Sequence, residues 1–439
     1  MSFLRIFDLH GLHIEDHKYL TNTRKIENAF IPSIAYIPLL QHIGKSAKLI
    51  VKIGDRVEEG DLIAEADGFF SANVHSPIPG VVTDIKESFI YNGKKSTVVV
   101  IKLDGKFSRT GQKEPRFGWR SISSASITNI IKDAGIVGLG GAVFPTHIKL
   151  SNQGDKKITH LYINGAECEP FITCDHRLML ERGEDIIEGI NVLEKIITPE
   201  KIYIGIETNK RDAIKNIKKC AKTNPKIKVI TLNAIYPRGD EKLLIKFISG
   251  KVIEPNKLPI DVGAIVVNVS TTLAIKEAVI NDKPLIDRVV TVTGSGIHNP
   301  ENLKVKIGTP IKDIIEECGG LKPNIKKVVV GGPMMGFSQV DLDVPISKGC
   351  SAIIAIADEY EKFNPNGVCI SCGKCITACK FGLMPTILNR LIKNKLFDEA
   401  VKDGVLLCKE CGACSYTCPA KIPLVQVFKM TKEFARRLK

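Results

Sequence analysis

The sequence predicts a multidomain protein of β and α/β domains that ends in a small helical domain. Residues 34 to about 105 consist of short apolar runs separated by turn residues, which is the pattern of consecutive strands. The middle of the chain alternates strand and helix patterns, which predicts an α/β layer. Eight of the 13 cysteines lie after residue 368, in two copies of one spacing. With 439 residues, the chain is long enough for about three or four domains.

The first predicted domain, residues 1–115, is a barrel-sandwich hybrid. Segments 51–60 and 75–84 carry the strand, Gly-Asp turn, Val and Gly pattern of lipoyl- or biotinyl-type barrel-sandwich domains. Those carriers hold a lysine at the tip of a hairpin. The corresponding turn here, Asp67-Gly-Phe-Phe70, contains no lysine, so we expect a barrel-sandwich domain without a prosthetic group.

The second predicted domain, residues 116–260, is an α/β layer. Ser123 is placed to cap a helix from Ala125 to Ala134, which Gly135 ends. The later strands and helices alternate, as in a parallel sheet; the segments are 161–164, 201–206, 210–222 and 228–232. In the third predicted domain, 261–345, residues 288–320 read as two strands and a short helix, which is compatible with a small β-grasp module.

The fourth predicted domain, residues 355–439, is helical and contains the cysteine runs. In the spacing C-x-x-C-x-x-C-x-x-x-C, three thiolates on one loop bind a cubane cluster, and the fourth ligates the other cluster. One [4Fe–4S] cluster is therefore assigned to Cys369, Cys372, Cys375 and Cys418. The other is assigned to Cys408, Cys411, Cys414 and Cys379. Zinc ribbons use more widely separated cysteine pairs, and disulfides suit secreted chains with a signal peptide, of which none is visible.

The net charge of +14 does not by itself identify a partner, because the basic residues are dispersed along a lysine-rich chain. A nucleic-acid-binding protein is expected to gather basic and aromatic residues on one element, so we expect no nucleic-acid partner. No segment approaches the ~20 apolar residues that span a bilayer. We therefore expect a soluble or peripheral protein in a reducing compartment.

A glycine loop, Gly138-Leu-Gly-Gly141, is the second candidate site. It is not a Rossmann fingerprint, because the spacing is G-x-G-G and a helix precedes it, so on its own it is equally a plain turn. Iron–sulfur clusters pass single electrons, whereas a nicotinamide transfers a hydride, and a flavin converts one into the other. The acidic turn 164–170 is either a solvent-facing loop or an acceptor of hydrogen bonds from such a cofactor.

With these motifs, the chain resembles the C subunit of the Rnf electron-transport complex over nearly its whole length. The resemblance includes both cysteine runs and the segments 38–44, 138–149, 164–179, 237–242 and 331–336. The middle region is similar to the flavin-binding 51-kDa subunit of respiratory complex I. The resemblance implies a barrel-sandwich hybrid, a 51-kDa-like flavin domain, a soluble-ligand-binding β-grasp (SLBB) module and a ferredoxin-like two-cluster domain.

The resemblance also implies a non-covalent FMN and NAD(H) as substrate. The residues implied around FMN are Gly138, Gly140, Gly141, Lys149, Asn164, Glu167, Tyr236, Gly239, Asp240, Glu241 and Asn268. Among them Lys149 is expected at the phosphate, with Asn164 and Glu167 near the isoalloxazine and ribityl chain. Phe144 and Glu169 match positions that meet NAD(H). The chain departs from the complex I pattern at Leu139, Val143 and Ala166, which replace arginine, glycine and aspartate.

By this resemblance the chain belongs to a membrane-bound, ion-translocating ferredoxin:NAD oxidoreductase. Hydride transfer at FMN needs no catalytic side chain, and electrons pass singly through the two clusters. The implied partners are the membrane subunits and the ferredoxin-like B subunit, with ferredoxin reached indirectly. The implied location is peripheral, at the cytoplasmic face of the bacterial cell membrane. The alternatives are a soluble flavin and iron–sulfur reductase, such as a cobalamin reductase, and a non-catalytic electron-transfer scaffold.

Overall fold

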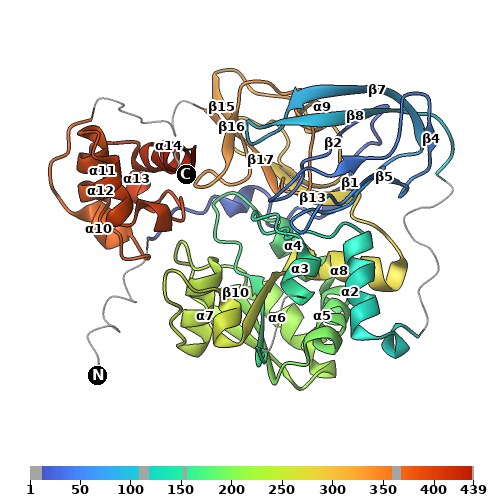
Figure 1. Ribbon diagram of the computed structural model, residues 1–439, viewed down its shortest axis with the longest axis horizontal. Helices are drawn as coiled ribbons and strands as arrows, with labels where there is room; N and C mark the ends of the chain where they lie inside the picture. Colours follow the sequence, from blue (N-terminus) through green and yellow to red (C-terminus); the bar gives the residue numbers. More distant parts are fainter. Residues whose placement is uncertain (1–11, 108–117, 152–155, 358–366, 438–439) are drawn as a thin grey trace.

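The computed structural model describes residues 12–107, 118–151, 156–357 and 367–437 (Figure 1). Two β-rich domains lie together along one side of an α/β domain, and the helical domain lies beside them. The predicted boundary at residues 115 and 116 lies outside the described residues. The architecture therefore follows the predicted order of domains, although two of the boundaries differ.

The N-terminal domain packs two small antiparallel sheets around one core. The first sheet has the order β2-β8-β7-β4 and the second β3-β5-β6. Their bounds are β2 (Ile34–Pro38), β3 (Lys48–Leu49), β4 (Arg56–Val57), β5 (Leu62–Glu65), β6 (Val74–His75), β7 (Gly80–Phe89) and β8 (Lys95–Leu103). Alternate residues of these strands, such as Ile37, Ile63 and Ile101, are fully buried between the sheets. This alternation is the two-residue periodicity of a half-buried strand.

The α/β domain contains a parallel sheet with the order β11-β10-β9-β12. The strands are β9 (His160–Gly165), β10 (Lys201–Glu207), β11 (Ile227–Leu232) and β12 (Ala264–Asn268). One core joins α2 (Ser124–Asp133), α5 (Gly183–Ile197), α6 (Arg211–Cys220) and α8 (Val269–Asn281). A second core, on the other face, includes α7 (Glu241–Ser249). Two short helices, α3 (Thr146–Ser151) and α4 (Cys174–Glu181), complete the layer.

This layer continues past the predicted boundary at residue 260. β12 pairs with β9 along its whole length, and α8 packs against α5. Residues 261–281 therefore belong with the α/β sheet, and the next domain begins with β13 (Asp287–Thr293). The boundary was misplaced because a local strand pattern does not reveal which sheet a strand joins.

The third domain contains a six-stranded sheet with the order β1-β14-β13-β17-β15-β16. Its other members are β1 (Ile26–Asn28), β14 (Glu301–Lys306), β15 (Ile325–Val330), β16 (Phe337–Gln339) and β17 (Ala352–Ala357), with α9 (Ile311–Glu317) packed against it. β1 comes from the N-terminal segment, and β17 runs beyond the predicted domain end at residue 345 and the predicted start of the next at 355. Strands from outside the predicted third domain thus complete this sheet.

The described part of the last domain is helical. Its helices are α10 (Lys374–Ala378), α11 (Pro385–Lys393), α12 (Phe397–Lys402), α13 (Ala413–Thr417) and α14 (Leu424–Arg437). α14 packs onto the domain through its apolar face, where Leu424, Val425 and Phe428 are buried with Cys414 and Cys418. Within the described ranges, none of the helices has the length and apolar character needed to cross a bilayer.

Candidate cluster and flavin sites

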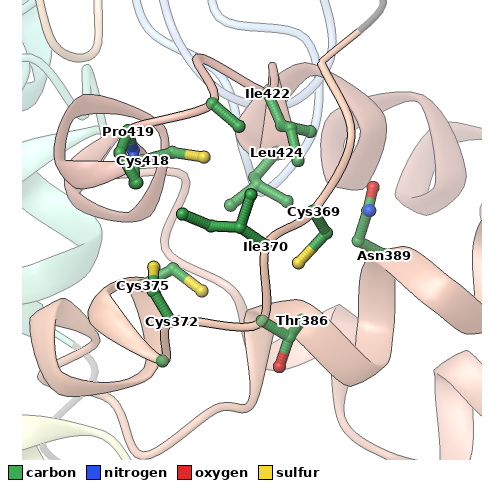
Figure 2. A pocket seen from close by; sticks show the side chains of 12 residues that line it. Cys369, Ile370, Cys372, Cys375, Thr386, Asn389, Cys418, Pro419, Ile422 and Leu424 are labelled. Atoms are coloured by element: carbon green, nitrogen blue, oxygen red, sulfur yellow. The ribbon is translucent and has the colours of Figure 1, made fainter.

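Four cysteines from the two runs line one cavity in the helical domain (Figure 2). This outer set consists of Cys369, Cys372, Cys375 and Cys418. Their sulfur atoms point toward a common space, which is otherwise lined mainly by apolar side chains, including Ile370, Ile422 and Leu424. Soft thiolate ligands in an apolar shell suit an iron–sulfur cluster. The structure thus brings together the four cysteines that the spacing assigned to one cluster.

The other four cysteines of the two runs form a second group, the inner set. It consists of Cys379, Cys408, Cys411 and Cys414. Burial raises the pKa of Cys411 to about 12, and the neighbouring Cys379 and Cys408 contribute to the rise. Burial and the same neighbours also raise the pKa of Cys414. Cys379 therefore lies with the second run rather than its own, which is the crossed arrangement expected of a two-cluster domain.

The two cysteine loops share one backbone conformation. Ser371 and Glu410 occupy equivalent positions with φ of 56° and 57°, and the glycines that follow, Gly373 and Gly412, have φ of 71° and 80°. Residues with a left-handed backbone conformation at matched positions make each loop tight, so that three cysteines of one loop can surround one cluster. The loops lead into α10 and α13, which pack against each other.

The inner and outer sets differ in what surrounds them. The Tyr236 hydroxyl of the α/β domain donates to the Cys411 carbonyl at 2.6 Å. A Cβ atom on Gly412 would lie 2.8 Å from the Met334 carbonyl oxygen, whereas one on Gly373 would meet nothing within 4 Å. In contrast, Cys369 and Cys372 are exposed. The inner set therefore adjoins the α/β domain, whereas two members of the outer set are exposed to solvent.

The candidate flavin site lies at the carboxyl edge of the α/β sheet. From β9 the chain proceeds to β10 and β11 on one side, and it then returns to β12 on the other side of β9. Ligands of open α/β sheets bind at such a switch point. Asn164 lies at the end of one of these strands and Asn268 ends the other, and they are register partners. Asn164 Nδ2 donates to the Gly239 carbonyl at 2.8 Å, which brings the 239–241 segment to the same place.

The glycine loop lies over this edge. A Cβ atom on Gly140 would lie 3.2 Å from the Asn268 Cβ, so the loop approaches β12 as closely as its lack of side chains permits. The loop is closed by Gly138 N donating to Phe144 O at 2.8 Å. Gly141 has φ of 100° with open space beside it, and it is exposed, as is Gly140. An exposed glycine backbone at a sheet edge fits the close approach of a phosphate or a planar ring.

Charged residues complete the edge. Lys149 on α3 donates to Glu241 Oε1 at 2.6 Å and to the Val266 carbonyl at 3.0 Å. Asp240 caps α7 by accepting from the backbone of the next helical residues. Lys149, Asp240 and Glu241 thus lie beside the glycine loop and the two asparagines. Lys149 supplies a cation at this edge, which would stabilise a phosphate, whereas the first N–H groups of α7 already donate to Asp240.

Three predicted site residues direct their side chains elsewhere. The Glu167 carboxylate accepts from Asp175 N at 2.6 Å, at the start of α4, and Glu169 Oε2 accepts from Met334 N at 3.1 Å. Burial raises the pKa of each of these two glutamates to about 7. Tyr236 bonds to the cysteine loop, as described above. The structure therefore uses these polar groups to hold α4, the 331–336 turn and the cluster domain.

Buried cations that the sequence did not single out position the predicted loops. Lys18 Nζ donates to the Glu169 carbonyl at 2.9 Å, and Lys210 Nζ donates to the Ala166 carbonyl at 2.7 Å. Arg288 Nη2 donates to the Leu139 carbonyl at 3.0 Å. Lys18 and Arg288 lie about 150 residues from their acceptors, so no local pattern could have revealed those two pairs.

Sequence comparison places the chain among subunits of redox-driven ion-translocating complexes. It is 43% identical, over 90% of its own length and 87% of the relative's, to the C subunit of the proton-translocating ferredoxin:NAD(+) oxidoreductase complex of Clostridium ljungdahlii. It is 38% identical, over 91% and 90%, to the Na(+)-translocating counterpart of Acetobacterium woodii. The C subunit of the ion-translocating oxidoreductase complex of Rhodobacter capsulatus is 39% identical, over 96% and 82%. This chain belongs to the RnfC family.

Family models match each part of this RnfC-family chain. The RnfC barrel sandwich hybrid domain matches residues 8–106, and the Nuo51 FMN-binding domain matches residues 131–277. The SLBB domain matches residues 289–338, and the 4Fe–4S dicluster domain matches residues 362–420. The predicted fold class is therefore confirmed, as are FMN and [4Fe–4S] clusters as cofactors. The flavin-domain match reaches residue 277, which agrees with the place of β12 in the α/β sheet.

Among solved structures, a chain of an NAD+-reducing [NiFe]-hydrogenase has a similar fold. The TM-score is 0.51 with 17% identity, and the match covers 71% of this chain and 63% of the hydrogenase chain. At this identity the likeness concerns the fold alone.

Proposed function

We propose that the chain is the NAD(H)- and FMN-binding iron–sulfur subunit of a membrane-bound, ion-translocating ferredoxin:NAD oxidoreductase. The names of two relatives state ferredoxin:NAD(+) oxidoreduction, and the flavin and dicluster matches supply the matching cofactors. The observation that carries the proposal is the contact between the flavin domain and the inner cysteine set, through Tyr236 and Cys411. A dinucleotide-oxidising site is thereby joined directly to one-electron carriers.

In the proposed site, the residues hold FMN rather than perform chemistry on it. When bound, FMN supplies the exchange between hydride and single-electron transfer. The N–H groups of Gly140 and Gly141 and the ammonium of Lys149 would bind its phosphate. Asn164, Asn268 and the 239–241 segment would form the adjoining sheet edge of the site. No side chain has to move a proton for the hydride step.

The two cysteine sets give the proposed electron path a direction in space. The inner set lies at the α/β domain, and the outer set lies beside exposed Val368 and Ile370, which are 79% and 66% exposed. The inner set would hold the cluster nearer the flavin domain and the outer set the cluster nearer this exposed surface, where we expect an electron-transfer partner to dock. The partner proposed is the ferredoxin-like B subunit, with ferredoxin reached through it. The membrane subunits would hold the chain peripherally at the cytoplasmic face.

The soluble-reductase and scaffold alternatives are not favoured. The relatives that match over most of both chains are subunits of ion-translocating complexes. The flavin-binding domain is matched over residues 131–277, which a non-catalytic electron-transfer scaffold does not require.

The flavin pocket is tested by the substitution Lys149→Ala. It removes the cation at the glycine loop, so FMN content should fall by about tenfold or more at equal added FMN, since a charge-assisted bond is lost. Iron content should not change. The matched control is Lys157→Ala, which removes an exposed lysine of the same domain that pairs with Glu200. Full flavin content in Lys149→Ala would contradict the pocket.

A further inference from the structure

The turn at residues 67–70 of the barrel domain presents two aromatic rings to solvent. Phe69 is 63% exposed and Phe70 is 46% exposed. Their rings meet edge to face, with centroids 4.9 Å apart. This is the turn where a lipoyl or biotinyl carrier would hold its lysine. Exposed paired phenylalanines are costly in water, and they are typical of a binding surface.

The turn is held in place at its base. Asn73 Oδ1 accepts from Ala66 N at 2.8 Å, and Asn73 Nδ2 donates to the Asp133 carbonyl at the end of α2, at 3.1 Å. The buried ammonium of Lys348 donates to the Asn73 carbonyl at 2.7 Å. The aromatic pair is therefore preorganised against the α/β domain rather than carried on a free hairpin.

The pair lies at the rim of the flavin site. The Phe70 ring meets the ring of Phe144, which follows the glycine loop, with centroids 5.9 Å apart. Ile43 N donates to the Val143 carbonyl at 3.1 Å, and Lys45 N donates to the Phe70 carbonyl at 2.9 Å. Val143 has φ of 43°, a conformation that costs a β-branched residue energy and persists only where the surroundings fix it. The barrel domain thus shapes the glycine loop and extends it with aromatic surface.

We propose that Phe69 and Phe70 form, with Phe144, the binding surface for the adenine ring of NAD(H). The inference rests on the proposed function. With the nicotinamide at the proposed flavin site, the adenosine half of the dinucleotide would lie outside that site, within reach of the rim where Phe70 meets Phe144. Aromatic side chains at that rim offer adenine a stacking partner, because every base presents a π-face to such rings. The barrel domain is then part of the substrate site, and not only a connection to partner subunits.

The experiment compares two electron donors in the full chain loaded with FMN and clusters. NADH contains adenine, whereas reduced nicotinamide mononucleotide does not. With ferricyanide as acceptor, the double variant Phe69→Ala/Phe70→Ala should raise KM for NADH by about tenfold, with the effect on KM rather than kcat. KM for the mononucleotide should change by less than about twofold. Phe89→Ala, which removes a 55% exposed phenylalanine of the same domain, is the control and should change neither value.

The outcomes are distinguishable. An equal rise for both donors, or no rise for NADH, would overturn the adenine site, even where NADH oxidation by the wild type upholds the proposed function. Loss of co-purifying subunits with an unchanged KM would identify the turn as a docking surface, and would also overturn it. A wild type that carries FMN but does not oxidise NADH would refute both proposals. Should the double variant fold poorly, Phe69→Ala alone tests the same point, because Phe69 is the more exposed ring. Phe70→Tyr, which keeps the aromatic ring, should raise KM for NADH less than Phe70→Ala.

Discussion

At the scale of single residues, the acidic turn shows how burial and hydrogen bonding oppose each other. Glu169 is buried against the 331–336 turn, and a carboxylate away from water favours its protonated form. The amide of Met334 opposes this effect by donating to the carboxylate. Burial prevails, so the pKa of Glu169 rises from an ordinary 4.5 to about 7.

The substitution Glu169→Gln should therefore alter the pH dependence of stability. Because the folded pKa is raised, the folded chain binds the proton more tightly, and its free energy of unfolding falls as pH rises from 4.5 to about 7. Between these two pH values the free energy of unfolding falls by up to ~1.4 kcal/mol per pH unit. Melting temperatures from pH 5 to 8 should decline less in Glu169→Gln than in the wild type. The exposed Glu87→Gln serves as control, and equal slopes in all three proteins would contradict the assignment.

What the sequence could predict at this scale depends on how local the signal is. The cysteine runs are contiguous, so their spacing alone predicted cluster ligands. The glycine loop on its own was equally a plain turn, and its flavin role came from the resemblance. The side-chain directions of Glu167 and Glu169 were not predictable, because partners such as Lys18 and Met334 lie far along the chain. Likewise, Asn268 was predicted at the site, but its bond to Asp175 at 2.6 Å emerges only from the fold.

At the scale of elements, the two cysteine loops form a natural comparison. Gly373 and Gly412 have the same position in the repeat and similar backbone angles. Only Gly412 packs against another domain, at the Met334 carbonyl. A side chain at either position carries the cost of a left-handed conformation, about 1 kcal/mol. A side chain at Gly412 must in addition displace the loop from the Met334 turn of the SLBB domain, next to the bond between Cys411 and Tyr236 of the flavin domain.

We therefore predict that Gly412→Ala slows electron transfer between FMN and the clusters, while Gly373→Ala does not. Stopped-flow absorbance after addition of NADH should show flavin reduction at the wild-type rate in both variants. Cluster bleaching should slow by about tenfold or more in Gly412→Ala, because transfer depends steeply on the gap between centres. Equal bleaching rates in the two variants would contradict the inner position of the second loop.

Element boundaries were predicted best where a cap or a breaker marks them. Ser123 accepts from Ser126 N at the start of α2, as its position before the helix predicted. The sheet that a strand joins was not predictable from such signals. β12 and β1 each pair with strands more than 100 residues away, so no local sequence pattern shows which sheet each of them joins.

At the scale of the whole molecule, buried cations join the domains at the flavin site. Arg288, on β13 of the SLBB domain, reaches the Leu139 carbonyl in the glycine loop and also the Lys348 carbonyl. Lys348 reaches the Gly135 carbonyl at 2.7 Å and the barrel domain at Asn73. Three domains thus meet around the glycine loop of the α/β domain.

The substitution Arg288→Ala should consequently weaken FMN binding from outside the pocket. It leaves the Leu139 carbonyl without its donor, so we expect a five- to tenfold weaker FMN affinity, or about 1–1.4 kcal/mol, which is the net contribution of a typical hydrogen bond. Fluorescence titration of FMN measures this. Arg56→Ala, which removes an exposed ion pair with Asp104, should bind FMN like the wild type. Unaltered affinity in Arg288→Ala would mean that the loop keeps its shape without the SLBB domain.

For the whole molecule, the proposed function predicts that NADH reduces the two cysteine-held clusters only when FMN is bound. Anaerobic EPR of the NADH-reduced chain, with and without FMN, is the decisive measurement of this path. We expect spin signals from two [4Fe–4S] clusters per chain when FMN is present, and none from NADH when FMN has been removed. Fewer than two clusters per chain, or clusters that NADH reduces without flavin, would contradict this electron path.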